Sequence, residues 1–363
     1  MTTNRRSLLT MGGVLSLGLT QPARAQSADR RLGYAIVGLG QYADVILPRF
    51  ADCRHSRVTA LVSGSMDKAR QYGARYGVPE GGLYTYETFD TIRNNPDVDI
   101  VYVILPNGMH HEYTVRAAAA GKHVMCEKPM ANTAAEAEQM IAACRAAGRK
   151  LMIGYRCRFE PSNREAIRVA RSAELGPTRI ITAEHGFNIG DPTQWRLNRA
   201  LAGGGSLMDI GIYSLQAARY LTGEEPVSVS AVESTDRSDI RFREVEDTIN
   251  FQLSFPSGVI ADCVSTYGSH HNRYRIVGTQ GWLDAESATA YEGNRLRLHR
   301  DGRTIDHPAP DAGQNQFSAM LDHLSQCVMT DSEPLVAGEE GLRDMRIIEA
   351  IYLAARERRT VML

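Results

Sequence analysis

Two polar segments of this sequence directly follow apolar runs that predict buried strands, and both could serve a bound ligand. Gly38-Leu39-Gly40-Gln41-Tyr42-Ala43 follows the run at 32–37 in the spacing G-x-G-x-x-A. The two glycines allow a tight turn that brings backbone N–H groups close to a pyrophosphate, and the small Ala43 lets helix and strand pack closely. We therefore expect a dinucleotide-binding turn, and the alternative is an ordinary strand-to-helix turn.

The second segment, Glu127-Lys128-Pro129, follows the predicted strand 123–126. Open α/β sheets bind their ligands at the carboxyl ends of their strands. A lysine at this place can donate a hydrogen bond to a substrate hydroxyl and favour the ionised form of a neighbouring acid. The alternative is a charged loop that ends at the proline.

A third segment contributes Asp209 and Tyr213, which are four residues apart behind the glycine loop 203–205. On a helix the two side chains point to the same face, and the glycines let a ligand come close. Ser206-x-x-Asp209 is also the spacing of a capping box, in which case Asp209 serves only the start of the helix.

The end of the second predicted strand reads Ser63-Gly64-Ser65-Met66-Asp67-Lys68. An NAD enzyme normally offers Asp or Glu to the ribose hydroxyls at this place. Hydroxyl groups, a flexible glycine and Lys68 suit a 2′-phosphate, so we expect NADP rather than NAD. Two alternatives remain: Ser65 or Asp67 only caps the helix while Lys68 is solvated, or Asp67 turns inward and repels a phosphate.

The first residues predict export. Asn4-Arg5-Arg6-Ser7-Leu8-Leu9 leads into an apolar run through Leu19 and then to Ala23-Arg24-Ala25, the pattern of a cleavage site. We expect residues 1–25 to be a twin-arginine signal peptide and the protein to reach the periplasm already folded. Because soluble nicotinamide cofactors are recycled inside the cell, an exported enzyme needs a tightly bound, non-dissociating NADP.

The charge balance and hydropathy of the chain exclude some classes of binding partner. With 41 basic and 42 acidic residues the chain has no broad field that would attract nucleic acid, and nothing after the signal predicts stable membrane insertion. The pairs His110-His111 and His270-His271 do not predict a metal site, because adjacent side chains diverge and no third ligand is suitably spaced. The six cysteines lack C-x-x-C spacing and are interpreted mostly as buried thiols.

The order of the predicted elements indicates an α/β fold with two domains. Up to residue 155, strands at 34–37, 58–63, 100–105, 123–126 and 151–155 alternate with helices at 67–76, 111–120 and 133–147, which is typical of a parallel, doubly wound sheet. Later segments alternate apolar and polar residues with period two, and 248–255 and 259–267 form a predicted hairpin around Pro256-Ser257-Gly258. Further helices are expected at 160–173, 206–221, 316–329 and 339–356. We expect a Rossmann domain at 30–155 and an α/β domain at 156–363 for substrate binding and oligomerisation, with a mainly antiparallel sheet.

Taken together, these motifs resemble a known family. The ordered set G-x-G-x-x-A, Leu105-Pro106-Asn107 with His110, Glu127-Lys128-Pro129 and Asp209-x-x-x-Tyr213 is similar to that of the Gfo/Idh/MocA oxidoreductases, in particular the periplasmic glucose-fructose and aldose-aldose branches. The resemblance spans nearly the whole mature chain. It implies a second domain with a large open sheet that commonly makes a dimer contact, hence a homodimer or higher homo-oligomer.

The resemblance also implies roles for individual residues. Lys128 matches the catalytic-site lysine, Tyr213 the acid/base tyrosine and Asp209 the aspartate that positions the sugar. Polyol dehydrogenases of the family usually carry histidine where Tyr213 stands, so this chain is expected to act on sugars or diols with a phenol assisted by Lys128. The cofactor or sugar pocket is expected to include Gly38, Leu39, Gly40, Gln41, Tyr42, Ser63, Gly64, Ser65, Lys68, Tyr86, Leu105, Asn107, His110, Glu127, Lys128, Arg156, Trp195 and Arg196. Arg156 and Arg158 flank the domain junction, and either could be only a solvated charge.

The expected reaction has two halves on one bound NADP. An aldose gives up hydride and proton at C1 and leaves as an aldonolactone, and a second sugar then receives both and leaves as an alditol in a ping-pong cycle. A conventional NADP-dependent sugar or dihydrodiol dehydrogenase with exchangeable cofactor is the alternative. An exported sugar-binding protein without catalysis is a further one. Trp282, Tyr267, Tyr274 and Tyr291 are interpreted as core or interface aromatics.

Overall fold

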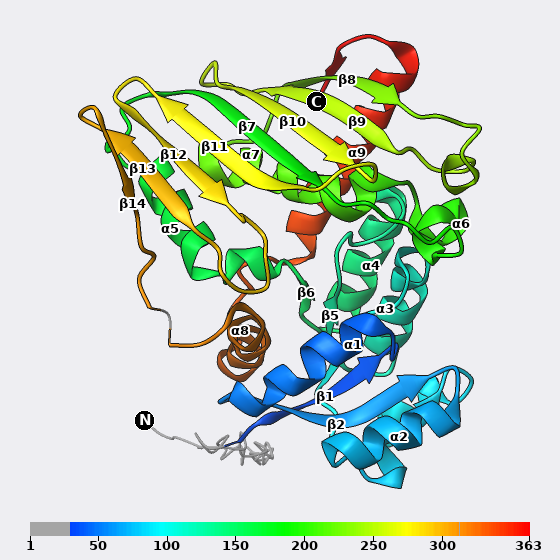
Figure 1. Cartoon of the computed structure of the whole chain (residues 1–363). Helices are drawn as coiled ribbons and strands as arrows, with labels where there is room; N and C mark the ends of the chain where they lie inside the picture. Colours follow the sequence, from blue (N-terminus) through cyan, green and yellow to red (C-terminus); the bar gives the residue numbers. More distant parts are fainter. Residues whose placement is uncertain (1–29, 312) are drawn as a thin grey trace, which may run out of the picture. The chain divides into compact units, whose positions relative to one another are not determined.

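The computed structural model describes residues 30–311 and 313–363. Its strands form two separate sheets, and helices pack against both (Figure 1). The predicted signal peptide lies outside the described residues. Among the residues that are described, no helix is both long and apolar enough to cross a bilayer.

The first sheet is parallel throughout, with the strand order β3-β2-β1-β4-β5-β6. Its strands are buried runs rich in β-branched and aliphatic residues, as expected of a sheet covered on both faces. The strands are β1 (Leu32–Val37), β2 (Ser56–Ser63), β3 (Leu83–Thr85), β4 (Ile100–Val103), β5 (His123–Cys126) and β6 (Leu151–Ile153). The intervening helices are α1 (Gln41–Ile46), α2 (Met66–Tyr76), α3 (His110–Ala119) and α4 (Ala134–Ala146). This confirms the predicted Rossmann architecture.

The second sheet is mainly antiparallel, in the order β14-β13-β12-β11-β7-β10-β9-β8-β15, with β7 and β10 as a parallel pair. The predicted hairpin is confirmed, since β9 and β10 pair antiparallel and the Phe255 amide donates to the Val259 carbonyl at 3.0 Å. The strands are β7 (Thr178–Gly186), β8 (Ser228–Ser234), β9 (Thr248–Ser254), β10 (Ile260–Thr266), β11 (His271–Gly278), β12 (Gly281–Glu286), β13 (Leu296–Arg300), β14 (Arg303–Asp306) and β15 (Val361–Met362).

Helices cover one face of this second sheet and leave the other open (Figure 1). The covering helices are α5 (Pro161–Ala170), α7 (Ile212–Thr222) and part of α9 (Gly338–Glu357). Alternation along β7 and β10 turns Ile181 and Ala261 toward the helices and their neighbours Ile180 and Ile260 toward the open face. The open face therefore carries exposed apolar side chains beside its polar ones.

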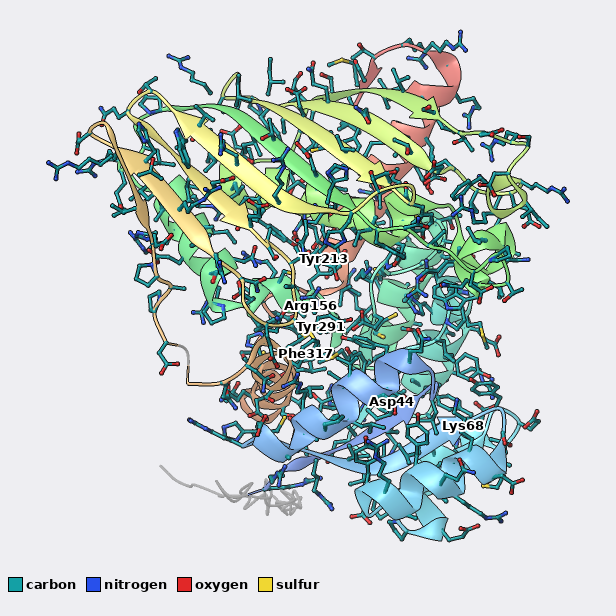
Figure 2. All side chains as sticks on the ribbon, in the orientation of Figure 1. Asp44, Lys68, Arg156, Tyr213, Tyr291 and Phe317 are labelled. Atoms are coloured by element: carbon teal, nitrogen blue, oxygen red, sulfur yellow. The ribbon has the colours of Figure 1, made fainter. Side chains whose placement is uncertain are left out.

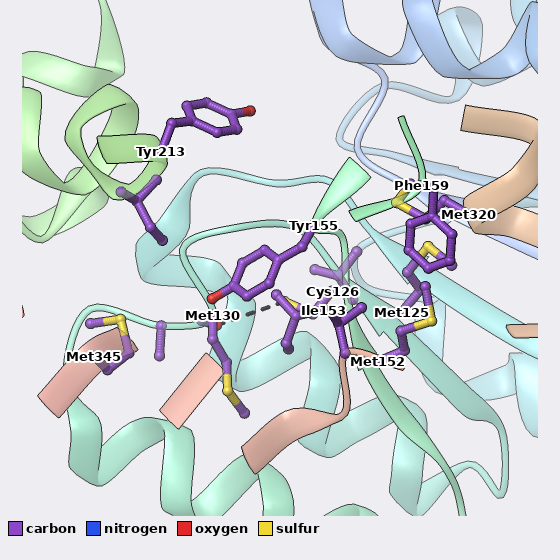
Figure 3. Close-up of a cluster of buried hydrophobic side chains, with 14 of the residues drawn as sticks. Met125, Cys126, Met130, Met152, Ile153, Tyr155, Phe159, Tyr213, Met320 and Met345 are labelled. Carbon is purple, nitrogen blue, oxygen red and sulfur yellow. Dashed lines mark hydrogen bonds between the residues drawn. The ribbon is translucent and has the colours of Figure 1, made fainter. Parts of the chain in front are cut away.

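The two closing helices return to the first sheet. α8 (Gln316–Thr330) packs on β2 and on the 3-10 helix η1 (Leu47–Asp52), and α9 packs on α4 and β6 as well as on β8. Figure 3 shows Met320 of α8 next to Phe159 and Met125, and Met345 of α9 on the side of Met130. Residues 31–363 consequently form a single unit in which both sheets share one continuous core.

Some predicted elements and element boundaries were wrong. β3 was not predicted, because three residues are too few to show a period, and strands expected to reach residues 105 and 155 end at Val103 and Ile153. The helix expected at 206–221 is a π-helical turn (Leu207–Gly211) followed by α7. π-helical turns often mark functional positions in helices.

Asp322 of α8 provides a test of how the closing helix is held. Its buried carboxylate accepts hydrogen bonds from the backbone of Arg54 (2.6 Å) and His55 (2.9 Å) and from the hydroxyl of Ser56 (2.9 Å). Asp322→Ala leaves these donors unpaired, and we expect it to lower the free energy of unfolding by about 2–4 kcal/mol. Denaturant titration measures the effect, with Asp67→Ala, whose side chain is 90% exposed, as the control. Equal stability of the two variants would contradict this role.

Candidate functional site

A cavity of about 770 Å³ lies at the carboxyl ends of β1, β2, β4 and β5 and is closed on its other side by elements of the second sheet. This is the edge at which parallel α/β sheets bind ligands. Of the residues predicted from the sequence, the cavity is lined by Gly38, Leu39, Gly40, Gln41, Tyr42, Ser63, Lys68, Tyr86, Leu105, Asn107, Glu127, Lys128, Arg156, Trp195, Arg196, Asp209 and Tyr213.

The glycine turn has the backbone that its sequence requires. Gly38 has φ +104°, a conformation that L side chains rarely adopt, and a Cβ there would lie 3.0 Å from the Ile104 carbonyl oxygen. Gly40 is different: it precedes α1 in ordinary extended backbone, and a Cβ would meet no atom within 4 Å. The space beside Gly40 belongs to the cavity, so a ligand can approach the backbone at this point.

Around the end of β2, hydroxyl and ammonium groups line the cavity. Ser63 and Lys68 face it, together with the ring of Tyr86. Ser65 caps α2 by accepting from the Lys68 amide at 3.4 Å, as one of the alternatives proposed. The side chain of Asp67 is 90% exposed and lies near Arg70, so it does not turn toward the cavity.

Lys128, Asp209 and Tyr213 are brought together from distant parts of the chain. The Lys128 ammonium donates to the backbone carbonyl of Asp209 and lies 3.3 Å from its Oδ1. The same nitrogen lies 4.8 Å from the centre of the Tyr213 ring. Since Lys128 follows β5 and the other two belong to the turn and helix beside β7 and β10, the cluster joins the two sheets.

Asp209 is held by three side chains. Besides Lys128, the Arg196 Nε donates to Oδ2 at 2.8 Å and the Tyr267 hydroxyl donates to the same oxygen at 3.1 Å. Burial would raise the pKa of Asp209, but Arg196 and Lys128 outweigh it and hold the pKa below its ordinary value. Burial would lower the pKa of Lys128, yet the nearby acidic side chains of Tyr213, Asp209 and Glu127 hold it above its ordinary value. The pair is therefore fully charged at neutral pH.

The helix start does not use Asp209 as a cap. Ser206 makes no side-chain capping bond, and its hydroxyl has no partner among the described residues. The backbone amides of Gly205 and Leu207 instead donate to the buried carboxylate of Glu246, at 2.7 and 2.9 Å. The capping-box alternative is thus wrong, and Asp209 is free to face Lys128.

Arg156 is buried and is not a solvated charge. Its guanidinium lies 5.3 Å from the centre of the Tyr213 ring and 4.7 Å from that of Tyr291 (Figure 2). Its Nη1 donates to the Gln316 side-chain oxygen at 2.7 Å and its Nη2 to the Thr289 carbonyl at 2.6 Å. Glu127, which also lines the cavity, accepts from the Tyr102 hydroxyl, and burial raises its pKa.

Three predicted pocket residues do not line the cavity. Gly64 and Ser65 lie beside it, and a Cβ on Gly64 would come within 3.1 Å of the Tyr86 ring. His110 is fully buried, and its two ring nitrogens lie 2.9 Å from the Pro129 carbonyl oxygen and 2.8 Å from that of Leu105. His110 therefore links the segment after β4 to the segment after Lys128.

One wall of the cavity was not predicted from the sequence. Tyr291 was interpreted as a core or interface aromatic, but it lines the cavity, and Tyr267, although buried, donates to Asp209. The other additional lining residues are Ile104, Pro106, Gly186, Phe187, Asp191, Gln194, Ile210, His270, His271, Asn272 and Thr289. Most lie at strand ends of the second sheet or in the segments that connect its strands, where local patterns give no signal. Among the described residues, no three or more His, Cys, Asp or Glu side chains are grouped as metal ligands.

The lining residues fit a dinucleotide. Backbone amides at the glycine turn suit a pyrophosphate, the open space beside Gly40 admits it, and Ser63 and Lys68 lie within the same cavity for the ribose end. From there the cavity continues without interruption to Lys128 and Tyr213. A ligand that spans the cavity thus has its far end beside a fully charged lysine–aspartate pair and a phenol.

Comparison with known proteins gives consistent matches. The model of the Gfo/Idh/MocA oxidoreductase family with NAD-binding Rossmann fold matches residues 32–155, and the model of the C-terminal domain matches residues 163–284. The crystal structure of an aldose-aldose oxidoreductase from Caulobacter crescentus, complexed with glycerol, is 64% identical with a TM-score of 0.91 and covers 92% of this chain and 100% of that one.

Two relatives are more distant. The D-xylose 1-dehydrogenase [NADP(+)] of Haloarcula marismortui is 32% identical over 93% of this chain and 94% of its own length. The trans-1,2-dihydrobenzene-1,2-diol dehydrogenase of Mus musculus is 28% identical over 82% of this chain and 88% of its own length.

Substitutions of the two turn glycines separate folding from ligand binding. Gly40→Val places its side chain in the open cavity, so we expect unchanged stability and at least roughly tenfold weaker nucleotide binding. Gly38→Ala forces a positive φ on alanine and is expected to destabilise the fold by about 1–3 kcal/mol. Calorimetric titration with NADP and thermal unfolding of both variants measure the difference. Normal nucleotide affinity in Gly40→Val would contradict this placement of the ligand.

Removal of the Asp209 charge should change the pH dependence of kcat/KM. Asp209→Asn takes away a negative charge that raises the pKa of Lys128, so burial and the now unpaired Arg196 lower that pKa. If the reaction needs the Lys128 ammonium, the alkaline limb of the kcat/KM profile must move to lower pH. Nitrogen NMR of the lysine side chain measures the same titration directly. An alkaline limb at the wild-type position would show that Lys128 is not held by Asp209.

Proposed function

The chain belongs to the Gfo/Idh/MocA oxidoreductase family, and from this premise we propose that it oxidises an aldose at C1 to an aldonolactone and reduces a second sugar to an alditol. Both half-reactions would use one NADP that stays bound. The observation that carries this proposal is the Lys128–Asp209–Tyr213 cluster at the far end of the cavity that starts at the glycine turn.

NADP is supported by the end of β2. Ser63 and Lys68 line the cavity there, whereas the only nearby carboxylate of the 63–68 segment, Asp67, points to solvent. A 2′-phosphate gains from an ammonium group and hydroxyl donors at this place. The xylose dehydrogenase relative is an NADP(+) enzyme by name. When bound, NADP supplies the acceptor and later the donor of a hydride.

We expect side chains of the protein, and not the cofactor, to carry out the proton transfer. In our proposal the deprotonated Tyr213 oxygen takes the proton of the anomeric hydroxyl in the first half-reaction, and the resulting phenol returns that proton to the carbonyl oxygen in the second. The positive charges of Lys128 and Arg156, at 4.8 and 5.3 Å from the ring centre, stabilise negative charge that develops on the phenol oxygen. Asp209 keeps Lys128 charged and in place.

The two-sugar reaction is supported by the similarity to the aldose-aldose oxidoreductase, which extends over the whole of that chain. An exported enzyme would need this two-sugar reaction, because a periplasmic enzyme has no soluble NADP pool with which to exchange its cofactor. We therefore propose periplasmic location, directed by the twin-arginine pattern at Arg5-Arg6. The exposed apolar side chains on the open sheet face support a homo-oligomer.

A conventional NADP-dependent dehydrogenase of sugars or dihydrodiols is the second candidate. It is favoured by the two relatives that carry dehydrogenase names. It uses the same lysine and tyrosine but exchanges its cofactor after each turnover. The two candidates therefore differ in cofactor retention and not in the catalytic residues.

Analysis of the purified protein tests the choice between them. Protein purified without added nucleotide is denatured, and the released nucleotide is identified and quantified. We expect NADP in near one-to-one amount, together with turnover of two sugars without added cofactor. Protein that is empty as purified and active only with free NADP would overturn the proposal in favour of the conventional dehydrogenase.

Substitutions in the cluster test its catalytic role. Tyr213→Phe removes the proton carrier and Lys128→Met removes the charge beside it, so each is expected to lower kcat by roughly 10²- to 10⁴-fold. Reduction of the bound nucleotide by aldose, followed by absorbance in a single turnover, measures the first half-reaction alone. Nucleotide content should remain near the wild-type value in Tyr213→Phe. Near-normal rates in both variants would remove the cluster from the mechanism.

A further inference from the structure

The turn between β12 and β13 reaches out of the second sheet to the cavity. We name residues 288–294 the strap. Thr289 and Tyr291 of the strap line the cavity, and Figure 1 shows the β12–β13 turn extending toward α8 and α1. The strap is therefore a connection of the second sheet that lines a pocket shared by the two sheets.

Asn163 and Asn272 bond to the backbone of Ala288 and Thr289 from within the second sheet's side of the chain. In addition, two buried polar side chains, Arg156 and Gln316, hold the strap by its carbonyls. Arg156 donates to the Thr289 carbonyl at 2.6 Å, and the Gln316 amide nitrogen donates to the carbonyls of Ala290 and Tyr291 at 3.0 and 2.8 Å. The side-chain oxygen of Gln316 in turn accepts from Arg156 at 2.7 Å. Gln316 is the first residue of α8, the helix that packs on η1 and β2, so this clamp fixes the strap to the nucleotide-binding part of the chain.

Aromatic contacts place the Tyr291 ring over the cavity. It packs edge-on against Phe317 at 5.2 Å and lies 4.7 Å from the Arg156 guanidinium. Tyr213, Arg156, Tyr291 and Phe317 follow one another from α7 to α8 in Figure 2. Tyr291 is 45% exposed, so it forms an outer wall of the cavity. A single ion pair on the outside, Arg49 with Glu292 at 3.0 Å, ties the strap to η1.

The opposite rim of the cavity is the loop that contains Asp191 and Gln194, and its contacts differ from those of the strap. Asp191 accepts from the amide and hydroxyl of Thr193, and Gln194 donates to the Ile189 carbonyl, so the hydrogen bonds of these two lining residues stay within their own loop. Arg196, at the end of the loop, bonds instead to Asp209. The exposed residues 191–193 carry no bond to the first sheet that matches the clamp at the strap. The two rims of the cavity thus differ in how firmly they join the two sheets.

We propose that the strap retains the nicotinamide cofactor while sugars exchange past residues 187–194, and that Gln316 is the residue that positions the strap. This rests on the proposed two-sugar function, because a cofactor that serves two successive sugars must stay while the lactone leaves. The rate of cofactor loss then depends on opening the strap, which breaks the hydrogen bonds from Gln316 and Arg156. Sugar exchange leaves those bonds intact.

Variants of Gln316 test this in the whole mature protein. Gln316→Glu keeps an oxygen for Arg156 but replaces the donor that faces two carbonyls, and Gln316→Met removes both functions. We expect NADPH to leave roughly 10- to 100-fold faster from both, since two hydrogen bonds are lost. The probe is bound NADPH, followed by fluorescence after addition of excess unlabelled NADP as a trap. Gln314→Met is the matched control, because the hydrogen bonds of the Gln314 side chain to described residues go to Asp52 and Asp322 and not to the strap.

A merely structural role would change different quantities. The thermal unfolding of the nucleotide-free protein should stay near wild type in both Gln316 variants, and the release rate of NADPH should stay near wild type in Gln314→Met. Arg49→Ala, on the exposed ion pair, should speed release only about two- to threefold. If the Gln316 variants fail to fold, Tyr291→Leu at the exposed ring is compared with wild type by NADPH release alone, which should be at least several-fold faster.

The outcomes separate the two proposals. Wild-type release of NADPH from folded Gln316→Glu and Gln316→Met, or from Tyr291→Leu, overturns the strap assignment. An empty wild-type protein overturns the proposed function, and the release rates are then measured after loading with NADPH. A faster rate in the Gln316 variants alone still supports the strap in that case.

Discussion

The ion pair between Lys128 and Asp209 is the interaction on which the rest of the site depends. It joins the carboxyl end of a parallel strand to a π-helical turn beside the second sheet, across 81 residues of sequence. Two charges in a buried place are stable only when they are paired and bonded. Arg196, Tyr267 and the Asp209 backbone carbonyl meet this demand, and in doing so they fix the ammonium beside the Tyr213 ring.

Several parts of the fold hold Lys128 and Asp209 at bonding distance from each other. β5 fixes Lys128, while Glu246 holds the amides at the start of the π-helical turn that carries Asp209. α8 and α9 then return to the first sheet and make both sheets share a core, so the cavity between them keeps its shape. A fold that simply connected two independent domains would leave the distance between Lys128 and Tyr213 free to vary.

Local patterns predicted much of this fold and the centre of the site. The glycine turn, the β9–β10 hairpin, Lys128, Asp209 and Tyr213 each carry a signal within a few residues. Tyr291, Gln316 and Glu246 carry none, because each acts through partners 25 or more residues away, such as Gln316 on the strap carbonyls. The π-helical turn was also not predictable, since it depends on Gly211 packing against Ser265 of β10.

The central claim is that one bound nucleotide carries hydride from the first sugar to the second. An aldose labelled with deuterium at C1 tests it most directly, in the presence of a second sugar and a large excess of free, unlabelled NADPH. We expect an alditol that carries the full deuterium content of the aldose, because the bound nucleotide does not mix with the pool of free NADPH. Deuterium diluted in proportion to the free NADPH would contradict it.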